Sequence, residues 1–562
     1  MKVENDFRQL NIKQIQLGNN RTKKFTTRRQ NPYSSAPSFT GGFDMFLRFL
    51  DTNQAWGANA VDIFCMVLPR TLTDFGRGSD AGIETMRREG MGTANHSMVG
   101  AYGALAGWAL AAGINRIYNL SDKDIKANSI FADAETIDMQ SKIYDAKLKA
   151  KADNPLSEYL KETLRNYEAL SPAENGKWVR LKETDVEKTA DIMEKEIRSV
   201  SVKMSKDAVN NAKNTIVSAL GAENNFRIVA GEGEKLHSSR YTVDYILENT
   251  FKLGKVFNKE KVIESFHNSS DIFWNPFIKA LKSMNIKRSL IGIGMASAVG
   301  MSAQPLNMYL TKKKTGKEEF VGGGKKDNSA WFKVKKSLVA AAFGAFVLST
   351  IGNPKNLVKD LQFKGYTPTI KQFKFIYGVT IMSRFIAARN DNELREASIK
   401  DFLGFVNWLI LGNFVQKLTA QAMDKTLIKK DGDGLINWIT KSALKTRDEV
   451  LHAALGDKVF GKDGKALNYK EMIKALPVNS PAKKQLKILT WAQLMGYAYS
   501  AIVLGRGIPK LNIYITNKAE AEKAAREQAQ TQTSQAQQDN MLKPANIEFL
   551  NQKNFTGRKL IG

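Results

Sequence analysis

Uncharged, apolar runs recur along the chain and alternate with charged segments. The run at residues 289–311 lies between Lys287-Arg288 and three lysines at positions 312–314. A helix of this length rises about 1.5 Å per residue and reaches roughly 34 Å, enough to cross the hydrocarbon core of a bilayer. Cationic side chains at both ends are typical of membrane helices, because they reach the lipid headgroups. The pattern therefore predicts a membrane span here.

Three further runs predict spans, at residues 90–115, 337–354 and 488–505. Small residues four positions apart occur in the first two, and such residues let two helix backbones approach closely in lipid. The candidate helix-packing residues are Gly103, Gly107, Ala111, Ala340 and Gly344. A glycine- and alanine-rich helix buried in a soluble core is the alternative for residues 90–115, although each glycine costs such a helix about 1 kcal/mol.

Two weaker apolar helices are expected at residues 375–388 and 402–416, either at the interface or buried between better spans. Three polar side chains fall within these two runs, and a fourth falls within the run at residues 289–311. Polar groups are costly inside a membrane and are often functional there. The intramembrane polar candidates are Gln304, Arg384, Asn407 and Asn413.

The net charge of +28 is unevenly distributed. Residues 121–285 contain 26 basic and 26 acidic side chains, so the whole excess lies in the regions that carry the apolar runs. Basic clusters beside apolar runs favour a bilayer with anionic lipids as the partner. Nucleic acid is the alternative partner, but the chain contains no RNP1 or zinc-finger motif. The single cysteine, Cys65, excludes an internal disulfide and fits a reducing compartment.

The charge-balanced residues 121–285 predict a helical soluble domain. Its clearest element is a helix over residues 185–220, with a capping box at Thr184 and Glu187 and a stop at Gly221. Apolar residues in this helix form a short heptad seam, which favours packing against helices of the same domain over a coiled coil with a helical protein partner. The seam residues are Val186, Ala190, Met193, Ile197, Val200 and Met204.

The remaining segments complete the expected organisation. Residues 1–42 predict a disordered basic arm, and residues 517–562 a frayed helix that leads into a glutamine-rich disordered tail. Between them we expect an apolar helical region, the inserted domain, a membrane region, a soluble helical segment and a last span. These occupy residues 43–120, 121–285, 286–417, 418–485 and 486–516.

Catalytic and metal-binding motifs are not evident in the sequence. The four histidines, at positions 96, 237, 267 and 452, lie far apart, and with one cysteine they make no zinc motif. Asp431 to Ile436 resembles the middle of an EF-hand loop, but the first and twelfth ligand positions fall on Lys429 and Thr440. Because calcium needs carboxylates there, we expect a turn. We predict no cofactor and no metal, favour a non-enzyme, and leave any small-molecule substrate open.

These observations predict an all-α, multi-pass helical membrane protein with an inserted helical extramembrane domain and disordered termini. Three functions remain open: a structural, scaffolding or interaction protein of the membrane, a transporter or channel component, and a soluble basic helical protein that binds nucleic acid or an acidic partner. The positive-inside rule places the Lys312–Lys336 loop in the cytoplasm. Basic residues on the outer flanks of the adjoining spans oppose this orientation.

Overall fold

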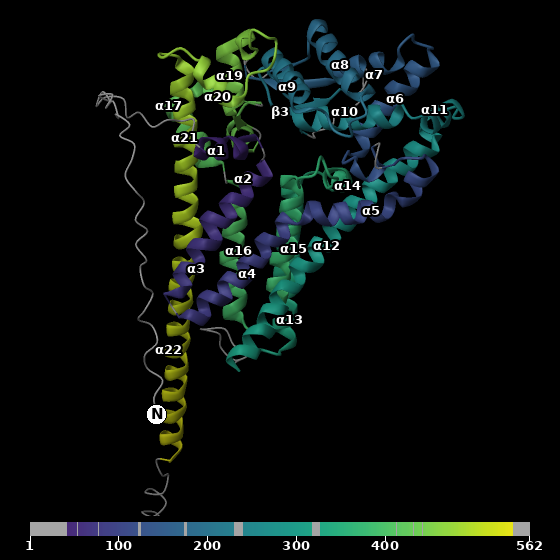
Figure 1. The fold of residues 1–562 in the computed structure, drawn as a ribbon. Helices are drawn as coiled ribbons and strands as arrows, with labels where there is room; N and C mark the ends of the chain where they lie inside the picture. The colour runs from purple at the N-terminus through teal and green to yellow at the C-terminus, as the bar shows by residue number, and fades with distance from the viewer. Residues whose placement is uncertain are drawn as a thin grey trace, which may run out of the picture. The chain divides into compact units, whose positions relative to one another are not determined.

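The computed structural model describes residues 42–542, except for residues 53, 77, 122–124, 173–176, 230–239, 317–325, 412, 431 and 441. The predicted N-terminal arm and the end of the predicted tail lie outside the described residues. The chain is mostly helical, with 77% helix and 5% strand, which confirms the helical class (Figure 1).

The N-terminal apolar region is a series of short helices followed by two longer ones. A π-helical turn, η1 (Asp62–Val67), separates α2 from α3, and a single turn residue, Met98, lies between α4 and α5. The predicted span at residues 90–115 therefore falls across two helices. The helices are α1 (Gly42–Thr52), α2 (Gln54–Val61), α3 (Leu68–Phe75), α4 (Ser79–Ser97) and α5 (Val99–Ile117).

The charge-balanced domain surrounds its own core, in which Tyr144, Tyr159, Phe257 and Phe266 pack edge to face or tilted. It also contains a four-stranded antiparallel sheet of order β2-β1-β3-β4, which the sequence analysis did not predict. Its elements are α6 (Ala134–Lys149), α7 (Pro155–Arg165), β1 (Tyr167–Ser171), β2 (Lys177–Val179), α8 (Glu183–Arg198), α9 (Lys206–Leu220), β3 (Asn224–Ile228), β4 (Tyr241–Thr242), α10 (Val243–Phe257) and α11 (Glu260–His267).

The single helix predicted over residues 185–220 was wrong, because α8 ends at Arg198 and α9 begins at Lys206. Ser205 caps α9 by accepting a bond from the Ala208 N–H, and its own N–H and hydroxyl donate to Glu196. The capping box was also wrong, since Lys182 occupies the N-cap of α8 without a side-chain bond. Gly221 does end α9 in the left-handed conformation (φ 64°).

The seam of α8 packs inside the domain. Val186, Ala190, Met193 and Ile197 are buried in the domain core, whereas Val200 lies beyond the helix and is 90% exposed. Met204, the last residue of the seam, is partly buried against the same core.

A long helix, α12 (Pro276–Thr315), leads from this domain into the second apolar region. It packs along α5, α4 and α15 (Ile370–Ala387), and α13 (Ala330–Ile351) packs on the other side of α15 (Figure 1). A short α14 (Leu357–Asp360) precedes α15. Next come α16 (Asp391–Phe405), a second π-helical turn, η5 (Val406–Ile410), and α17 (Phe414–Met423).

The C-terminal third begins with a compact segment of short elements and ends in two long helices. The short elements are β5 (Ile428–Lys429), α18 (Leu435–Thr440), β6 (Ala443–Leu444), α19 (Arg447–Leu455) and α20 (Tyr469–Ala475). A third π-helical turn, η8 (Ala501–Gly507), connects α21 (Pro481–Ser500) to α22 (Ile508–Leu542). The glutamine-rich residues 528–538 lie within α22, which begins before the predicted helix and extends to Leu542, and the remainder of the predicted tail lies outside the described residues.

Three helical stretches are long and apolar enough to cross a membrane, namely Ser79–Ile117, Ala330–Ile351 and Pro481–Gln537. They overlap the predicted spans at residues 90–115, 337–354 and 488–505. The stretch at residues 289–311 lies in α12 and is not among them, because Gln304, Pro305 and Asn307 lower its hydropathy.

Candidate functional site

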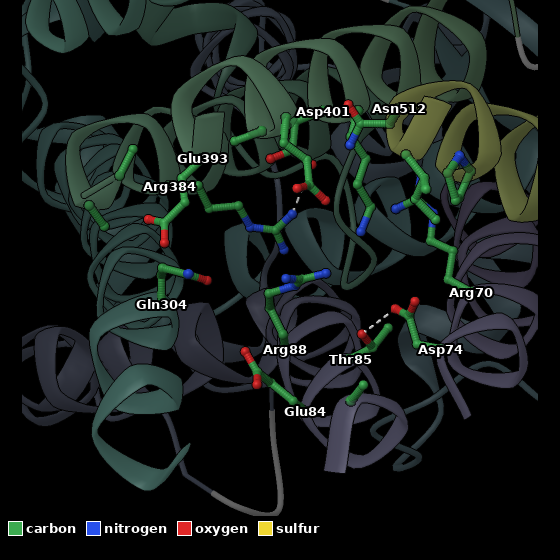
Figure 2. Close-up of a pocket in the computed structure, with 18 residues that line it drawn as sticks. Arg70, Asp74, Glu84, Thr85, Arg88, Gln304, Arg384, Glu393, Asp401 and Asn512 are labelled. Atoms are coloured by element: carbon green, nitrogen blue, oxygen red, sulfur yellow. Dashed lines mark hydrogen bonds and ion pairs between the residues drawn. The ribbon is translucent and has the colours of Figure 1, made fainter. Parts of the chain in front are cut away.

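A cavity of about 140 Å³ lies among the apolar helices and is lined largely by charged side chains (Figure 2). Six helices contribute to it: α3, α4, α12, α15, α16 and α22. The charged residues of its wall are Arg70, Asp74, Glu84, Arg88, Arg384, Glu393, Glu396, Lys400 and Asp401. We call this cavity the polar pocket.

Glu89 of α4 lies at the centre of a buried ion network beside the polar pocket. Its carboxylate is shared by four cations, with N–O distances of 3.3 Å to Arg88, 3.4 Å to Lys400, 3.6 Å to Arg70 and 3.7 Å to Arg384. Charged groups that are buried in an apolar environment must be paired. Because the partners of Glu89 lie on different helices, the network joins α3, α4, α15 and α16.

Arg70 connects the network to the π-helical turn η8. Its Nε donates to the carbonyl oxygen of Leu504 at 3.1 Å. The next residue, Gly505, lies against Cys65 and Pro69, and a Cβ atom there would lie 2.8 Å from the Cys65 carbonyl oxygen. A larger residue at position 505 would therefore separate η1 from η8. π-Helical turns are frequent at functional sites in proteins.

Further polar groups are buried between the same helices. Thr93 donates to Asp62 at 2.6 Å, and Asn95 donates to the Ala296 carbonyl at 2.7 Å. His96 is 1% exposed and lies among the rings of three aromatic residues, Phe373, Tyr377 and Trp408. The interior of this apolar region is thus unusually polar.

The structure brings together two of the four intramembrane polar candidates. Gln304 and Arg384 both line the polar pocket, from α12 and α15 (Figure 2). Asn407 lies elsewhere, where it accepts a bond from the Tyr499 hydroxyl at 3.0 Å. Asn413 is exposed just before α17.

The small residues lie where helices approach each other. A Cβ atom on Gly292 of α12 would lie 3.0 Å from the Cα of Gly103, and one on Gly344 would lie 2.9 Å from the sulfur of Met382. Gly107 lies against the Arg288 guanidinium, and Ala111 and Ala340 are buried. Gly103, Gly107 and Ala111 therefore lie at the α5–α12 contact, and Gly344 lies at the α13–α15 contact.

Arg288 does not form the lipid-facing collar that the sequence suggested. It is fully buried, donates to the carbonyl oxygens of Ile130 and Asn128 at 2.9 Å, and lies over the Phe131 ring. These contacts fix the beginning of the inserted domain to α12.

A second buried network joins the inserted domain to the C-terminal segment. Lys429 and Glu449 are fully buried and form an ion pair at 2.7 Å. Lys429 also donates to Asn224, and Glu449 accepts from the backbone N–H of Glu223. We call this network the junction.

The junction continues to α1 and α21. Arg48 makes a bidentate pair with Asp448 at 2.7 and 2.6 Å. Arg447 pairs with Asp44 and Asp51 of α1, and it donates to Thr490 of α21. The three charged residues of α1, Asp44, Arg48 and Asp51, are therefore partners of α19.

Burial changes the protonation of two junction residues. It raises the pKa of Glu223 to about 7, although the Lys213 ammonium at 2.6 Å opposes the increase. It lowers the pKa of His452 below its usual value of 6.5, despite the bond between Nδ1 and the Asp448 carbonyl. Glu223 therefore stays neutral up to a higher pH than it would in water, and His452 stays neutral down to a lower pH.

The segment that resembles an EF-hand loop forms a turn with Gly432 and Gly434 at positive φ, while Asp431 lies outside the described residues. Among the described residues, no group of three histidine, cysteine, aspartate or glutamate side chains is placed to hold a metal ion.

Comparison of the chain with protein families, curated proteins and solved structures gave no match.

Sequence reasoning missed most of the polar pocket. Arg70, Lys400 and Asp401 lie near apolar runs but not within them. Glu84, Arg88 and Glu89 directly precede the uncharged run at residues 90–115, so they read as a charged flank. If residues 79–97 are treated as one helix, these three charged residues and the start of the run belong to the same helix.

Proposed function

We propose that the chain is an integral, multi-pass membrane protein of structural, scaffolding or interaction type, with the lipid bilayer as its partner. One observation carries the proposal: in each span-like helix, more than half of the most apolar window is not buried by protein. The buried share of the most apolar window is 33% in Ser79–Ile117, 22% in Ala330–Ile351 and 44% in Pro481–Gln537.

Large apolar side chains project outward on each of these stretches. Trp108 is 73% exposed, Leu338 61% and Ile502 67%. In water this surface would cost about 25 cal/mol per Å², and contiguous apolar patches of this kind are typical of membrane or partner surfaces. A soluble protein with these helices as its core would cover them, so the observation favours the bilayer over the soluble alternative.

The polar interior of the same region also supports the proposal. Arg384 and Glu89 are 9% and 5% exposed, while neighbouring helices direct apolar side chains outward. Charged residues of membrane proteins face the interior of the helix bundle and pair there. The distribution of polarity is therefore that of a membrane bundle.

The junction supports a scaffolding role. It holds α1, the inserted domain, α19 and α21 together through buried pairs, so the extramembrane part is rigidly connected to the helix of the last span. A rigid connection suits a protein that presents a domain at a fixed position on a membrane surface.

For the orientation, we propose that the Lys312–Lys336 loop faces the cytoplasm and anionic lipids, as the positive-inside rule predicts. A small epitope tag in this loop, probed with antibody before and after selective permeabilisation, tests the orientation. Tag access from outside intact cells would reverse it.

A transporter or channel component is the second candidate, and the polar pocket is the observation that favours it. Gln304 and Arg384 line a cavity between helices, as substrate-pathway residues do. Stopped-flow light scattering of proteoliposomes with a panel of small solutes tests this candidate. Permeation no faster than in protein-free liposomes would remove it.

The membrane proposal is tested by cysteine accessibility. In a Cys65→Ala background, we would compare Leu338→Cys, on the outward face of α13, with Val200→Cys, between α8 and α9. N-ethylmaleimide crosses membranes but reacts with thiolates in water. We expect rapid labelling at position 200 and labelling at position 338 only after denaturation. Equal labelling rates in native membranes would contradict the proposal.

A further inference from the structure

We propose that the polar pocket binds a phosphate group, either from a lipid headgroup or as free phosphate. This inference goes beyond the proposed scaffolding role and does not depend on it. It rests on the hydrogen-bond donors that converge on the cavity, on the sharing of Glu89 among four cations, and on the size of the cavity.

The first step concerns donors. Arg70 is 2% exposed and lines the pocket, yet neither of its terminal nitrogens, Nη1 and Nη2, has a hydrogen-bond partner. The Nε of Arg88 is also buried without a partner. Buried donors that lack acceptors are costly, so such groups are expected to meet water or a ligand.

The second step concerns acceptors. The one carboxylate common to Arg70, Arg88 and Lys400 is Glu89, at 3.3 Å or more from each. Charge-assisted bonds between nitrogen and oxygen are typically about 2.7–2.9 Å long. Glu89 is therefore divided among four cations and neutralises none of them fully.

Three other carboxylates of the wall have partners of their own, whereas Oε1 of Glu84 is buried without a hydrogen-bond partner. Asp401 pairs with Arg384 at 3.0 Å, Glu393 pairs with Arg389 at 2.6 Å, and Asp74 accepts a bond from Thr85 at 2.6 Å. Figure 2 shows the guanidinium groups of Arg384 and Arg88 directed toward the middle of the cavity. An anion at this point would meet cations from several helices.

The third step concerns shape. A phosphate group offers oxygens in a tetrahedral arrangement, which suits guanidinium groups that approach from different helices, whereas a flat carboxylate suits one bidentate arginine. The cavity of about 140 Å³ is large enough for a phosphate group with a short substituent. The carbonyl oxygens of Gln304 and Asn512, which have no hydrogen-bond partner, could accept from a hydroxyl or ammonium group on that substituent.

The test uses full-length protein purified in detergent, with Arg88→Gln as the pocket variant. Arg88 is 21% exposed, so its loss is less disruptive than the loss of a fully buried arginine. Arg116→Gln, at an exposed position on α5, removes the same charge elsewhere and is the matched control. Binding of inorganic phosphate is measured by thermal shift and calorimetry, and co-purified phospholipid by native mass spectrometry and phosphorus assay.

If the source is free phosphate, inorganic phosphate should raise the melting temperature of the protein. Arg88→Gln should then weaken phosphate binding about tenfold or more, and Arg116→Gln should leave it unchanged. If the source is a lipid, inorganic phosphate should have no effect, and a bound phospholipid should be lost from Arg88→Gln alone. Binding of neither, or equal binding by both variants, would overturn the inference. Should Arg88→Gln misfold, Arg88→Lys replaces it and should retain reduced binding.

Discussion

Arg384 of α15 donates to Asp401 of α16 across 3.0 Å, inside a helix bundle whose outward side chains are largely apolar. Both side chains are less than 10% exposed, and Glu89 of α4 provides a second carboxylate for Arg384 at 3.7 Å. This pair joins helices that the sequence placed in different apolar runs. The stability of the whole bundle should therefore depend on it.

Replacing Asp401 with asparagine should destabilise the bundle by about 3–5 kcal/mol, because the Arg384 charge remains buried without its closest partner. The exposed pair of Lys335 with Asp391, also on α16, provides the control, and Asp391→Asn should cost about 0.5 kcal/mol. Thermal unfolding in detergent measures both. Similar melting temperatures for the two variants would contradict the structural role of the Arg384–Asp401 pair.

The close approach of α5 and α12 at Gly103 predicts a second effect. A Cβ atom at position 103 would meet the Phe363 ring, so Gly103→Ala should destabilise the protein by about 1–3 kcal/mol through overpacking. Gly113, on the same helix, has open space around it, and Gly113→Ala should be neutral or slightly stabilising. If Gly103→Ala were as stable as Gly113→Ala, the contact between Gly103 and the Phe363 ring would be in error.

The junction makes a prediction about the inserted domain and the C-terminal segment that it connects. Glu449→Gln should cost about 3–5 kcal/mol, because the fully buried Lys429 ammonium loses its only carboxylate at 2.7 Å among the described residues. Glu248→Gln removes a half-exposed partner of Lys252 and should cost about 0.5 kcal/mol. Hydrogen exchange at α19 and β3 should accelerate in the first variant only.

Stability should decrease as the pH falls through the usual pKa of His452. Burial lowers this pKa in the folded chain, and the nearby Lys213 and Arg48 charges act in the same direction, while Asp448 opposes them. The unfolded chain therefore takes up the proton first, so the contribution is complete above about pH 6.5 and is lost as the pH falls below it.

The pH dependence of unfolding between pH 7 and 5 checks this expectation. His452→Gln should make the pH dependence of stability shallower. His267→Gln, at an exposed position, should leave the pH dependence as in the wild type. An unchanged slope in His452→Gln would show that other groups, such as Glu223, govern the response.

The sequence predicted the helical class and the approximate position of three apolar helices, because hydropathy and length are local properties. It did not predict the small sheet, since β2 and β4 are only three and two residues long and depend on pairing with β1 and β3. It also overvalued residues 289–311, because the basic residue before this run, Arg288, is buried against the inserted domain.

The polar pocket was only partly predictable. Gln304 and Arg384 were visible as polar residues inside apolar runs, and the structure places both on the pocket wall. Arg70, Glu89 and Lys400 are separated from them by tens to hundreds of positions along the chain. Only tertiary packing of α3, α4, α15 and α16 brings their charges together.

The central claim is that the apolar helices are embedded in a bilayer. Alkaline carbonate extraction of membranes from cells that express the full chain tests it most directly, because the wash releases soluble and peripheral proteins. We expect the chain to remain in the membrane pellet with a known multi-pass protein. Its release into the supernatant with a peripheral control would contradict the membrane account and favour the soluble, basic alternative.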